Sequence, residues 1–398
     1  MIADPLAVKL VEAAHELVRR DQCGLAWDAV QLALAVDAGV ANAHMLKAHL
    51  LELRGEVLAA LPHWRAAARL EPGMPGHRFN LALALLGCGM LTEGFALQEA
   101  RLEKPDWNSL AAAGSFAGLR HRVPGPLDDL TGKRVLAFTE QGMGDMLWAA
   151  RFLPALAERC AKLDLACPPT LRPVLAHVAH VAPGGLLGPP EDQPAAKLNM
   201  AALSEQYDAF VPMMSLPNLL GGAGAVVPWL RPDARRVTAW RERFAVALPG
   251  RRPIVGVVWR ANPASNAGAA RTFPPSVLGS LGRAGAVNLQ GGGSIGRDAL
   301  AGAFDPLAAG DVPLDEYAAM LAATDLLISA DTMAAHLAGS MGHPTWVVVP
   351  RVANFYWGHT GTGSPWYPGS RVFRQADKVG WTDVGAAITR ALASLEPR

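Results

Sequence analysis

Cysteine is scarce in this chain, with four among 398 residues: Cys23, Cys88, Cys160 and Cys167. They form no CxxC pair, and no histidine stands at metal-binding spacing beside them. A disulfide framework and a structural zinc site are therefore not expected, and the pattern favours a reduced, cytoplasmic protein. The N-terminus lacks a basic start followed by an apolar core, and no run of about 18 apolar residues occurs. These absences predict a soluble chain without a signal peptide or a membrane-spanning helix.

An excess of charge of either sign is also missing. The formal net charge is +1 and only 18% of the residues are charged, so bulk attraction gives no reason to expect nucleic acid as a partner. The hydrophobic share of 51% excludes general disorder. A chain of 398 residues is too long for one ordinary core, and two or three domains are expected.

Familiar phosphate-binding and metal-binding motifs are missing as well. No GxGxxG turn follows an expected strand, and GGGSIG at 291–296 lacks the spacing and the lysine of a P-loop. NAD and ATP are therefore not expected as ligands. No DxD-like pair occurs where it would hold a metal-bound diphosphate, because Asp128 and Asp129 fall in a linker. We expect neither a cofactor nor a metal.

The first hundred residues repeat with a period of 34, which is typical of tetratricopeptide repeats. The matching pairs are Gly39 and Gly73, Gly55 and Gly89, Ala26 and Ala60, Ala33 and Ala67, and Ala48 and Ala82. We predict an all-α solenoid of about three repeats over 1–104. The third repeat is degenerate, with Gly94 and Arg101 in place of alanines, and we expect it to cap the array. Such arrays usually present a groove to a polypeptide; a purely structural array is the alternative.

A Pro- and Gly-rich region at 105–130 is predicted to be a connecting helix and linker. After it, a βαβ unit is expected from a β run, a glycine turn, a helical segment and a second β run, at 134–138, 141–145, 146–160 and 163–166. This unit begins an N-terminal α/β lobe, which we place at 131–250.

A C-terminal α/β lobe is predicted at 251–398, with the joint near Pro249 to Pro253. Its expected strands are 254–259, 287–289, 326–328 and 345–349. The amphipathic segment 381–395 is expected to cross back onto the first lobe.

The first lobe offers two carboxylates around its glycine turn, Glu140 and Asp145. Either would be able to accept a proton from an attacking hydroxyl, and Gly142 and Gly144 would let a substrate approach the backbone. An ordinary helix-capping role for Asp145 is the alternative.

The second lobe carries a polar trio, Asp331, Thr332 and His336, where an apolar strand passes into a helix. Unpaired N–H groups and the helix dipole make such a helix start a site for phosphate, and Thr332 adds a hydroxyl donor. We expect a nucleotide or nucleotide-sugar there. The alternative is that Asp331 only caps the helix and His336 is an interior histidine.

Other polar residues follow the neighbouring strands of this lobe. They are Trp259, Arg260, Asn262, Arg271 and Gln290. Arginines at this edge would be able to neutralise a diphosphate without a metal. Gln290 has an ordinary turn role as its alternative.

The chain resembles bacterial tetratricopeptide proteins fused to a glycosyltransferase domain of the two-lobed GT-B type. These are related to heptosyltransferases and more distantly to protein O-GlcNAc transferase. The resemblance runs in family order through EGFALQEARLE, EQGMGDMLWAARFLPALA, YDAFVPMMSLPNLL, VPWLRPDARRVTAWRERF, VGVVWRANP, NLQGG, DLLISADTMAAHLAGSMGHPTWVVVP and SPWYPGSRVFRQ. It implies two Rossmann-like lobes, a nucleotide-sugar bound mainly by the C-terminal lobe, and an acceptor approaching from the N-terminal lobe and the repeats.

The resemblance also implies roles for residues. Asp145 matches the general base of heptosyltransferases, with Glu140 as the substitute. The donor-binding positions are Asp331, Thr332, His336, Trp259, Arg260, Asn262 and Gln290. The family lysine after the NP turn is missing, since the loop reads ASNAGAARTF, which leaves Arg260 and Arg271 to stabilise the departing diphosphate.

We therefore expect a metal-independent glycosyltransferase that moves a sugar from a nucleotide-sugar to an acceptor hydroxyl. The acceptor would be a protein or glycan recruited by the repeats, with flagellin or another surface protein suggested by the family. The rival hypothesis is an interaction scaffold whose transferase lobes bind nucleotide without turnover, which the missing lysine favours slightly. A sugar-nucleotide epimerase ranks last, because it gives the repeats no task.

Overall fold

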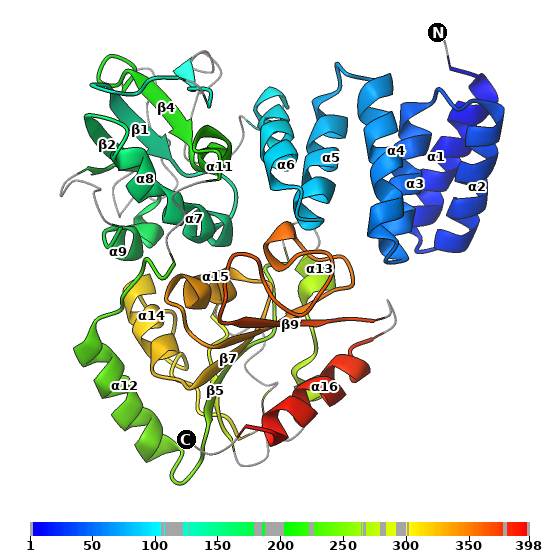
Figure 1. The fold of residues 1–398 in the computed structure, drawn as a ribbon. Helices are drawn as coiled ribbons and strands as arrows, with labels where there is room; N and C mark the ends of the chain where they lie inside the picture. Colours follow the sequence, from blue (N-terminus) through cyan, green and yellow to red (C-terminus); the bar gives the residue numbers. More distant parts are fainter. Residues whose placement is uncertain are drawn as a thin grey trace. The chain divides into compact units, whose positions relative to one another are not determined.

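The protein divides into two compact units (Figure 1). The computed structural model describes residues 3–104, 107, 122–126, 128–178, 185–187, 203–222, 227–263, 265, 268–278, 284–291, 300, 302–376 and 380–395. The first unit holds Met1–Trp107 together with Arg351–Thr360, and the second holds the remainder of the chain. The connecting helix expected within 105–130 falls largely outside the described residues.

Six helices in three consecutive pairs build the first unit, which is compatible with a repeat solenoid (Figure 1). They are α1 (Pro5–Arg19), α2 (Cys23–Val36), α3 (Ala41–Leu53), α4 (Val57–Leu70), α5 (Pro75–Gly87) and α6 (Leu91–Gln98), followed by the 3-10 helix η1 (Glu99–Glu103). The repeated alanines Ala14, Ala48 and Ala82 are fully buried, as are Ala26 and Ala60. Small side chains at these positions let neighbouring helices approach closely.

The third helix pair departs from the other two at Gly94 and Arg101. A Cβ on Gly94 would lie 2.7 Å from the Leu86 side chain, so the glycine lets α6 approach α5 more closely than alanine would. Arg101 is 2% exposed and pairs with Glu99 at 2.9 Å. A buried arginine held by its own segment thus fills the place of the earlier alanine.

A return of the chain at Arg351–Thr360 completes the first unit, which the expected domain boundaries did not include. Two glycines of the helices make room for it: a Cβ on Gly55 would lie 2.6 Å from Arg351, and one on Gly87 would lie 2.2 Å from His359. The Gly87 carbonyl accepts a hydrogen bond from the His359 backbone N–H at 2.8 Å. The Phe355 ring meets Phe95 edge to face.

The N-terminal sheet of the second unit is parallel, in the order β3-β2-β1-β4. Its strands are β1 (Arg134–Phe138), β2 (Lys162–Ala166), β3 (Leu186–Leu187) and β4 (Ala209–Pro212). The predicted strands at 134–138 and 163–166 are confirmed, and β3 and β4 were not predicted. Buried apolar residues fill β1 and β4, as in a sheet covered on both faces.

The helical segment predicted at 146–160 is broken into three pieces: α7 (Met143–Ala149), η4 (Ala150–Phe152) and α8 (Leu153–Ala157). Pro154 lies at the start of α8, where its missing N–H costs least. The short elements that follow are η5 (Pro169–Leu171), α9 (Arg172–Leu175), η6 (Met213–Ser215) and α11 (Leu216–Leu219). Helix α12 (Ala234–Ala247), capped by Asp233, leads to the second sheet.

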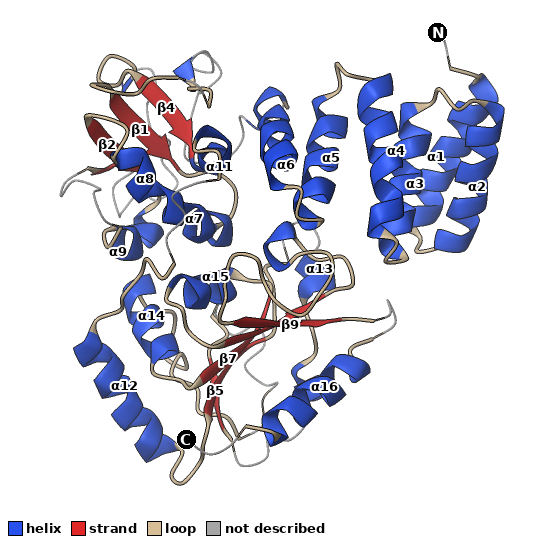
Figure 2. Cartoon of the chain, viewed as in Figure 1, coloured by secondary structure: helices blue, strands red, loops and turns tan. Residues whose placement is uncertain are grey.

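The C-terminal sheet is also parallel, in the order β6-β5-β7-β8-β9. Figure 2 labels three of its strands, β5, β7 and β9. Its strands are β5 (Ile254–Val258), β6 (Gly285–Asn288), β7 (Leu326–Ala330), β8 (Thr345–Val349) and β9 (Ser370–Arg374). Its other elements are α13 (Gly268–Arg271), η7 (Pro275–Leu278), α14 (Leu314–Ala322), α15 (Met333–Ser340) and η9 (Phe355–Trp357). The predicted α/β organisation with parallel sheets is confirmed.

The expectation that the closing segment 381–395 crosses onto the first lobe is wrong. Helix α16 (Thr382–Ala393) buries Val384, Ile388 and Ala391 in the core of the C-terminal sheet. A Cβ on Gly385 would lie 2.2 Å from the Val277 carbonyl oxygen, so the helix rests tightly on η7. Among all helices of the described ranges, none is long and apolar enough to cross a membrane.

Candidate functional site

The predicted site residues follow strands β1, β5 and β7, which lie where the strand order of each parallel sheet reverses. In the C-terminal sheet, β5 is flanked by β6 and β7, and in the N-terminal sheet β1 is flanked by β2 and β4. Crossover connections leave such neighbouring strands toward opposite faces, and ligands bind outside the carboxyl ends at these points. Arg260 follows β5, Asp331 follows β7, and Asp145 follows β1, so the sequence positions and the topology coincide.

The junction of β7 and α15 gives Thr332, not Asp331, the capping position. Thr332 has an extended backbone (φ −140°, ψ 172°), and its hydroxyl lies 3.1 Å from that of Ser329. Because α15 begins at Met333, its first N–H groups face the carboxyl end of the sheet. The alternative in which Asp331 merely caps the helix is therefore wrong.

Asp331 is instead the centre of a buried charged cluster. Its carboxylate, on a residue 2% exposed, lies 3.5 Å from Nη1 of Arg271 and 3.7 Å from Nε2 of His336. Arg271 also donates from Nη1 to the Asp331 backbone carbonyl at 3.1 Å and from Nη2 to the Ser265 hydroxyl at 2.6 Å. Arg271 therefore fixes the segment after β5 to the end of β7 and offsets the charge of a buried carboxylate.

His336 extends this cluster to Tyr367. Its Nδ1 lies 2.9 Å from the Tyr367 hydroxyl, and both residues are buried. Burial raises the pKa of Tyr367, opposed by the Arg151 guanidinium and supported by the carboxylates of Asp145 and Asp331. The hydroxyl therefore stays protonated and can donate to His336 or to a ligand.

Arg151, which belongs to η4 of the N-terminal lobe, also contacts Tyr367. It is 1% exposed, lies 4.5 Å from the Tyr367 ring centroid, and donates to the backbone carbonyls of Trp148 and Trp366 at 2.8 and 2.7 Å. The Trp148 and Trp366 rings meet edge to face at 5.0 Å. Within the second unit, this aromatic contact holds α7 against the chain that precedes β9.

The turn before α7 holds Asp145 at the third position of the helix. Its Oδ2 accepts a hydrogen bond from the Gly142 N–H at 2.9 Å, so the alternative capping contact is present. The left-handed residue of this turn is Gln141 (φ 62°), not a glycine. Gly144 lets the His336 ring lie close to the backbone of α7, because a Cβ at this position would lie 2.7 Å from Cδ2 of His336. The space predicted for a substrate at Gly144 is thus taken by His336.

Glu140 and the residues after β5 have structural contacts. Glu140 is 4% exposed and accepts a hydrogen bond from the Met214 N–H at 3.0 Å, which joins β1 to the end of β4. Trp259 is 3% exposed and belongs to the hydrophobic core. Oε1 of Gln290 accepts from the N–H groups of Trp259 and Arg260 at 3.1 and 2.8 Å. Gln290 therefore joins the ends of β5 and β6.

Asn262 is exposed, and Arg260, like Arg271 and Gln290, is half-buried. The Asn262 carbonyl accepts from the Ser265 hydroxyl at 2.6 Å, which holds the following turn. Sequence reasoning missed Tyr367, Arg151 and Ser329. The first two lie in the family-like stretches SPWYPGSRVFRQ and EQGMGDMLWAARFLPALA, which were the available signal.

In the part of the chain that the structure describes, no group of three or more His, Cys, Asp or Glu side chains could hold a metal ion. The side chains nearest the Asp331 carboxylate are those of Arg271 and His336.

No protein-family model matches the chain. Over 380 residues it is 30% identical to Protein FlbA of Caulobacter vibrioides, an alignment that covers 85% of the chain and 59% of that relative. The chain thus spans less than two thirds of the length of the curated relative it matches.

Two solved structures are similar to part of the chain. The E. coli ADP-heptose LPS heptosyltransferase II shares 14% identity at a TM-score of 0.41, covering 66% of this chain and 100% of that one. The family 9 glycosyl transferase from Veillonella parvula shares 12% identity at a TM-score of 0.44, covering 68% and 100%.

Proposed function

We propose that the protein is a glycosyltransferase of the two-lobed GT-B type, which transfers a sugar from a nucleotide-sugar to an acceptor hydroxyl. One observation carries the proposal: the carboxylate turn of the N-terminal lobe meets the buried polar cluster of the C-terminal lobe, with Gly144 against His336. The motif resemblance supports the same reaction class.

The donor would bind at the carboxyl end of the C-terminal sheet. The first N–H groups of α15 would receive its phosphates, and Arg260 would add a positive charge. Arg271 would contribute mainly by holding Asp331, because its guanidinium already bonds to Asp331 and Ser265. The leaving diphosphate would be stabilised by this helix and by Arg260 in place of the missing lysine, without a metal.

Asp145 would act as general base on the acceptor hydroxyl. Its Oδ2 is held by the Gly142 N–H, which fixes the side chain, and it is close enough to Tyr367 to affect that hydroxyl electrostatically. Glu140 is the weaker candidate, because it is buried and holds the Met214 N–H. The acceptor would be a protein or glycan recruited by the helical unit, with flagellin or another surface protein as the candidates that the family resemblance offers.

The proposal is tested first by donor binding. A panel of nucleotide-sugars and free nucleotides is added to the purified chain, with and without EDTA, and the melting temperature is followed. We expect a rise for one nucleotide class that EDTA leaves unchanged and that Arg260→Ala reduces. Absence of a rise with every donor would favour the scaffold hypothesis, and a rise abolished by EDTA would refute metal independence.

Turnover is then followed as release of nucleotide from the nucleotide-sugar that depends on an added acceptor, whose hydroxyl receives the sugar. Asp145→Asn should lower the rate by a factor of about 100 to 10,000, the usual contribution of a general base, while donor binding persists. Glu158→Gln, an exposed carboxylate of the same lobe, is the matched control and should keep full activity. Equal rates for Asp145→Asn and the unchanged chain would exclude Asp145 as the base.

A further inference from the structure

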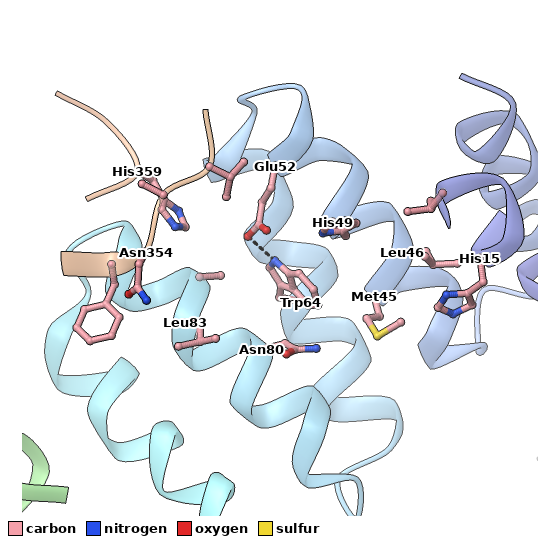
Figure 3. A pocket seen from close by; sticks show the side chains of 15 residues that line it. His15, Met45, Leu46, His49, Glu52, Trp64, Asn80, Leu83, Asn354 and His359 are labelled. Atoms are coloured by element: carbon pink, nitrogen blue, oxygen red, sulfur yellow. Dashed lines mark hydrogen bonds between the residues drawn. The ribbon is translucent and has the colours of Figure 1, made fainter. Parts of the chain in front are cut away.

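The helical unit contains a pocket of about 490 Å³ that the transferase chemistry does not use (Figure 3). Three helices line it, α1, α3 and α5, with Trp64 of α4 beside them. The segment Val352–Phe355 and His359 close one end, and His15 stands at the other (Figure 3). Every lining residue belongs to the first unit.

The 34-residue period explains which residues line the pocket. His15, His49 and Leu83 occupy the same place in successive repeats, as do Leu46 and Asn80, and Val18 and Glu52. Residues at one repeat position lie on one face of stacked helices. The repeats are alike in backbone, and the side chains at these positions give the pocket its individual chemistry.

Glu52 is the only acidic residue of the lining. It is 8% exposed, and its Oε1 accepts a hydrogen bond from Nε1 of Trp64 at 2.8 Å. Among the described residues, Trp64 is the sole hydrogen-bond donor to this carboxylate, and no arginine or lysine lines the pocket. A buried carboxylate without a cationic partner is costly, and a ligand cation would remove that cost.

The remaining lining suits an extended polypeptide. Met45, Leu83 and Phe355 supply apolar surface. The carboxamides of Asn80 and Asn354 also line the pocket, and no other described residue is hydrogen-bonded to either of them. A carboxamide both donates and accepts, which matches the N–H and C=O groups of a backbone.

We propose that this pocket binds an extended polypeptide segment through a lysine or arginine side chain that reaches Glu52. Apolar contacts and the two carboxamides hold the backbone, and the carboxylate selects the cation. The pocket would be the place where the helical unit, Met1–Trp107 with Arg351–Thr360, recruits a protein. This purpose rests on the proposed function. The binding itself does not require sugar transfer.

The charge of the pocket also depends on pH. Burial raises the pKa of Glu52 to about 7, although the Trp64 hydrogen bond opposes the shift. The titratable groups nearby are His49 on the same helix, His15 on α1, His359 at the closed end and Cys88 after α5. From pH 6 to 8 the Glu52 carboxylate gains negative charge, which favours a bound cation.

The test uses calorimetric titration of the full chain with four alanine–serine nonapeptides. These differ only at the central residue, which is lysine, arginine, norleucine or glutamate. We expect the lysine and arginine peptides to bind about tenfold tighter than norleucine at pH 8, as for one charge-assisted hydrogen bond. Glu52→Gln, which keeps an acceptor for Trp64, should erase this preference. Glu56→Gln, an exposed neighbour outside the pocket, should retain it.

Three outcomes overturn the proposal: equal binding of lysine and norleucine peptides, a preference that survives in Glu52→Gln, or no binding of any peptide at millimolar concentration. If Glu52→Gln fails to fold, titrations of the unchanged chain at two pH values test the proposal instead. Its preference for the lysine peptide over the norleucine peptide must be smaller at pH 6 than at pH 8. Absence of a cation preference in the unchanged chain, with sugar transfer intact, refutes the pocket alone. Cation preference without sugar transfer refutes only the transferase.

Discussion

At the scale of single residues, the proposed site consists of buried polar side chains. Asp331, His336 and Tyr367 are each nearly inaccessible, and each has its partner within the same cluster. Buried groups of this kind are costly when a partner is removed, because a donor or acceptor is then left without water. Substitutions here should therefore affect stability and activity together.

Tyr367→Phe tests the hydrogen bond between the Tyr367 hydroxyl and Nδ1 of His336. We expect the free energy of unfolding to fall by about 1 to 3 kcal/mol, the usual cost of removing a partner from a buried polar atom. Turnover should fall too, because the imidazole loses the contact that orients it. Urea denaturation and nucleotide release measure the two effects. Unchanged values for both would show that this hydroxyl is dispensable.

Glu52→Gln tests the buried carboxylate of the helical unit. The pKa of Glu52 is raised from 4.5 to about 7 by burial, so the folded state holds a proton that the unfolded state releases between these values. Its stabilising contribution is complete below pH 4.5 and lost as the pH rises through 7. The loss is on the order of 3 kcal/mol. Replacement by neutral glutamine should therefore raise the melting temperature at pH 8 and change little at pH 4.5.

Melting curves at both pH values check this prediction, with Glu56→Gln as the control that should show no difference. A gain of equal size at both pH values would mean that the effect of Glu52→Gln does not come from ionisation.

Close contacts between elements depend on glycines that leave space for a neighbour. Gly144 on α7 admits His336 of α15, Gly87 on α5 admits His359, and Gly385 on α16 admits the Val277 carbonyl. None of these three has a left-handed backbone. Their value lies in the missing Cβ, which lets helices and loops approach more closely than alanine would allow.

Gly144→Ala tests the contact of α7 with α15. The new Cβ would lie 2.7 Å from Cδ2 of His336, which forces the ring or the helix to move. We expect a loss of about 1 to 3 kcal/mol in the free energy of unfolding and a lower turnover rate. Gly24→Ala is the matched control, since Gly24 is also the second residue of a helix and nothing lies within 4 Å of its Cβ position. Equal stability of both variants would refute the contact.

At the scale of the whole molecule, the chain returns from the second unit to complete the first. Phe355 is 3% exposed, and Tyr356 and Trp357 are 1% and 0% exposed. Three consecutive aromatic residues are therefore buried in a segment that the helical unit shares. A protein lacking the helices would present part of this apolar surface to water.

Removal of residues 1–104 should therefore leave a chain that binds more of the dye ANS and elutes as aggregates in size-exclusion chromatography. Removal of 1–37 alone measures the dye binding that comes from the uncovered face of α3, because α3 to α6 keep the contacts with Arg351, Phe355 and His359. A monomeric fragment without added dye binding would show that the segment needs no helical partner.

Sequence patterns predicted the central strands well and the peripheral ones poorly. The apolar runs at β1, β5, β7 and β8 are buried along their whole length or nearly so, and such runs identify parallel strands directly. Strand β9 carries Arg371 and Arg374 at the edge of its sheet, and β4 has four residues, so neither pattern is distinct. A very short strand, or one that carries charged residues, has too few consecutive apolar residues to be recognised from local composition.

The sequence by itself determined the period of the helices, the order of the α/β units and the polar residues after each strand. These follow from local spacing, because repeats, apolar runs and turn residues act over few neighbours. Only the tertiary structure decided that Asp331 pairs with Arg271, that His336 occupies the space at Gly144, and that residues 351–360 complete the helical unit. Those contacts join residues far apart in the chain, and packing alone selects them.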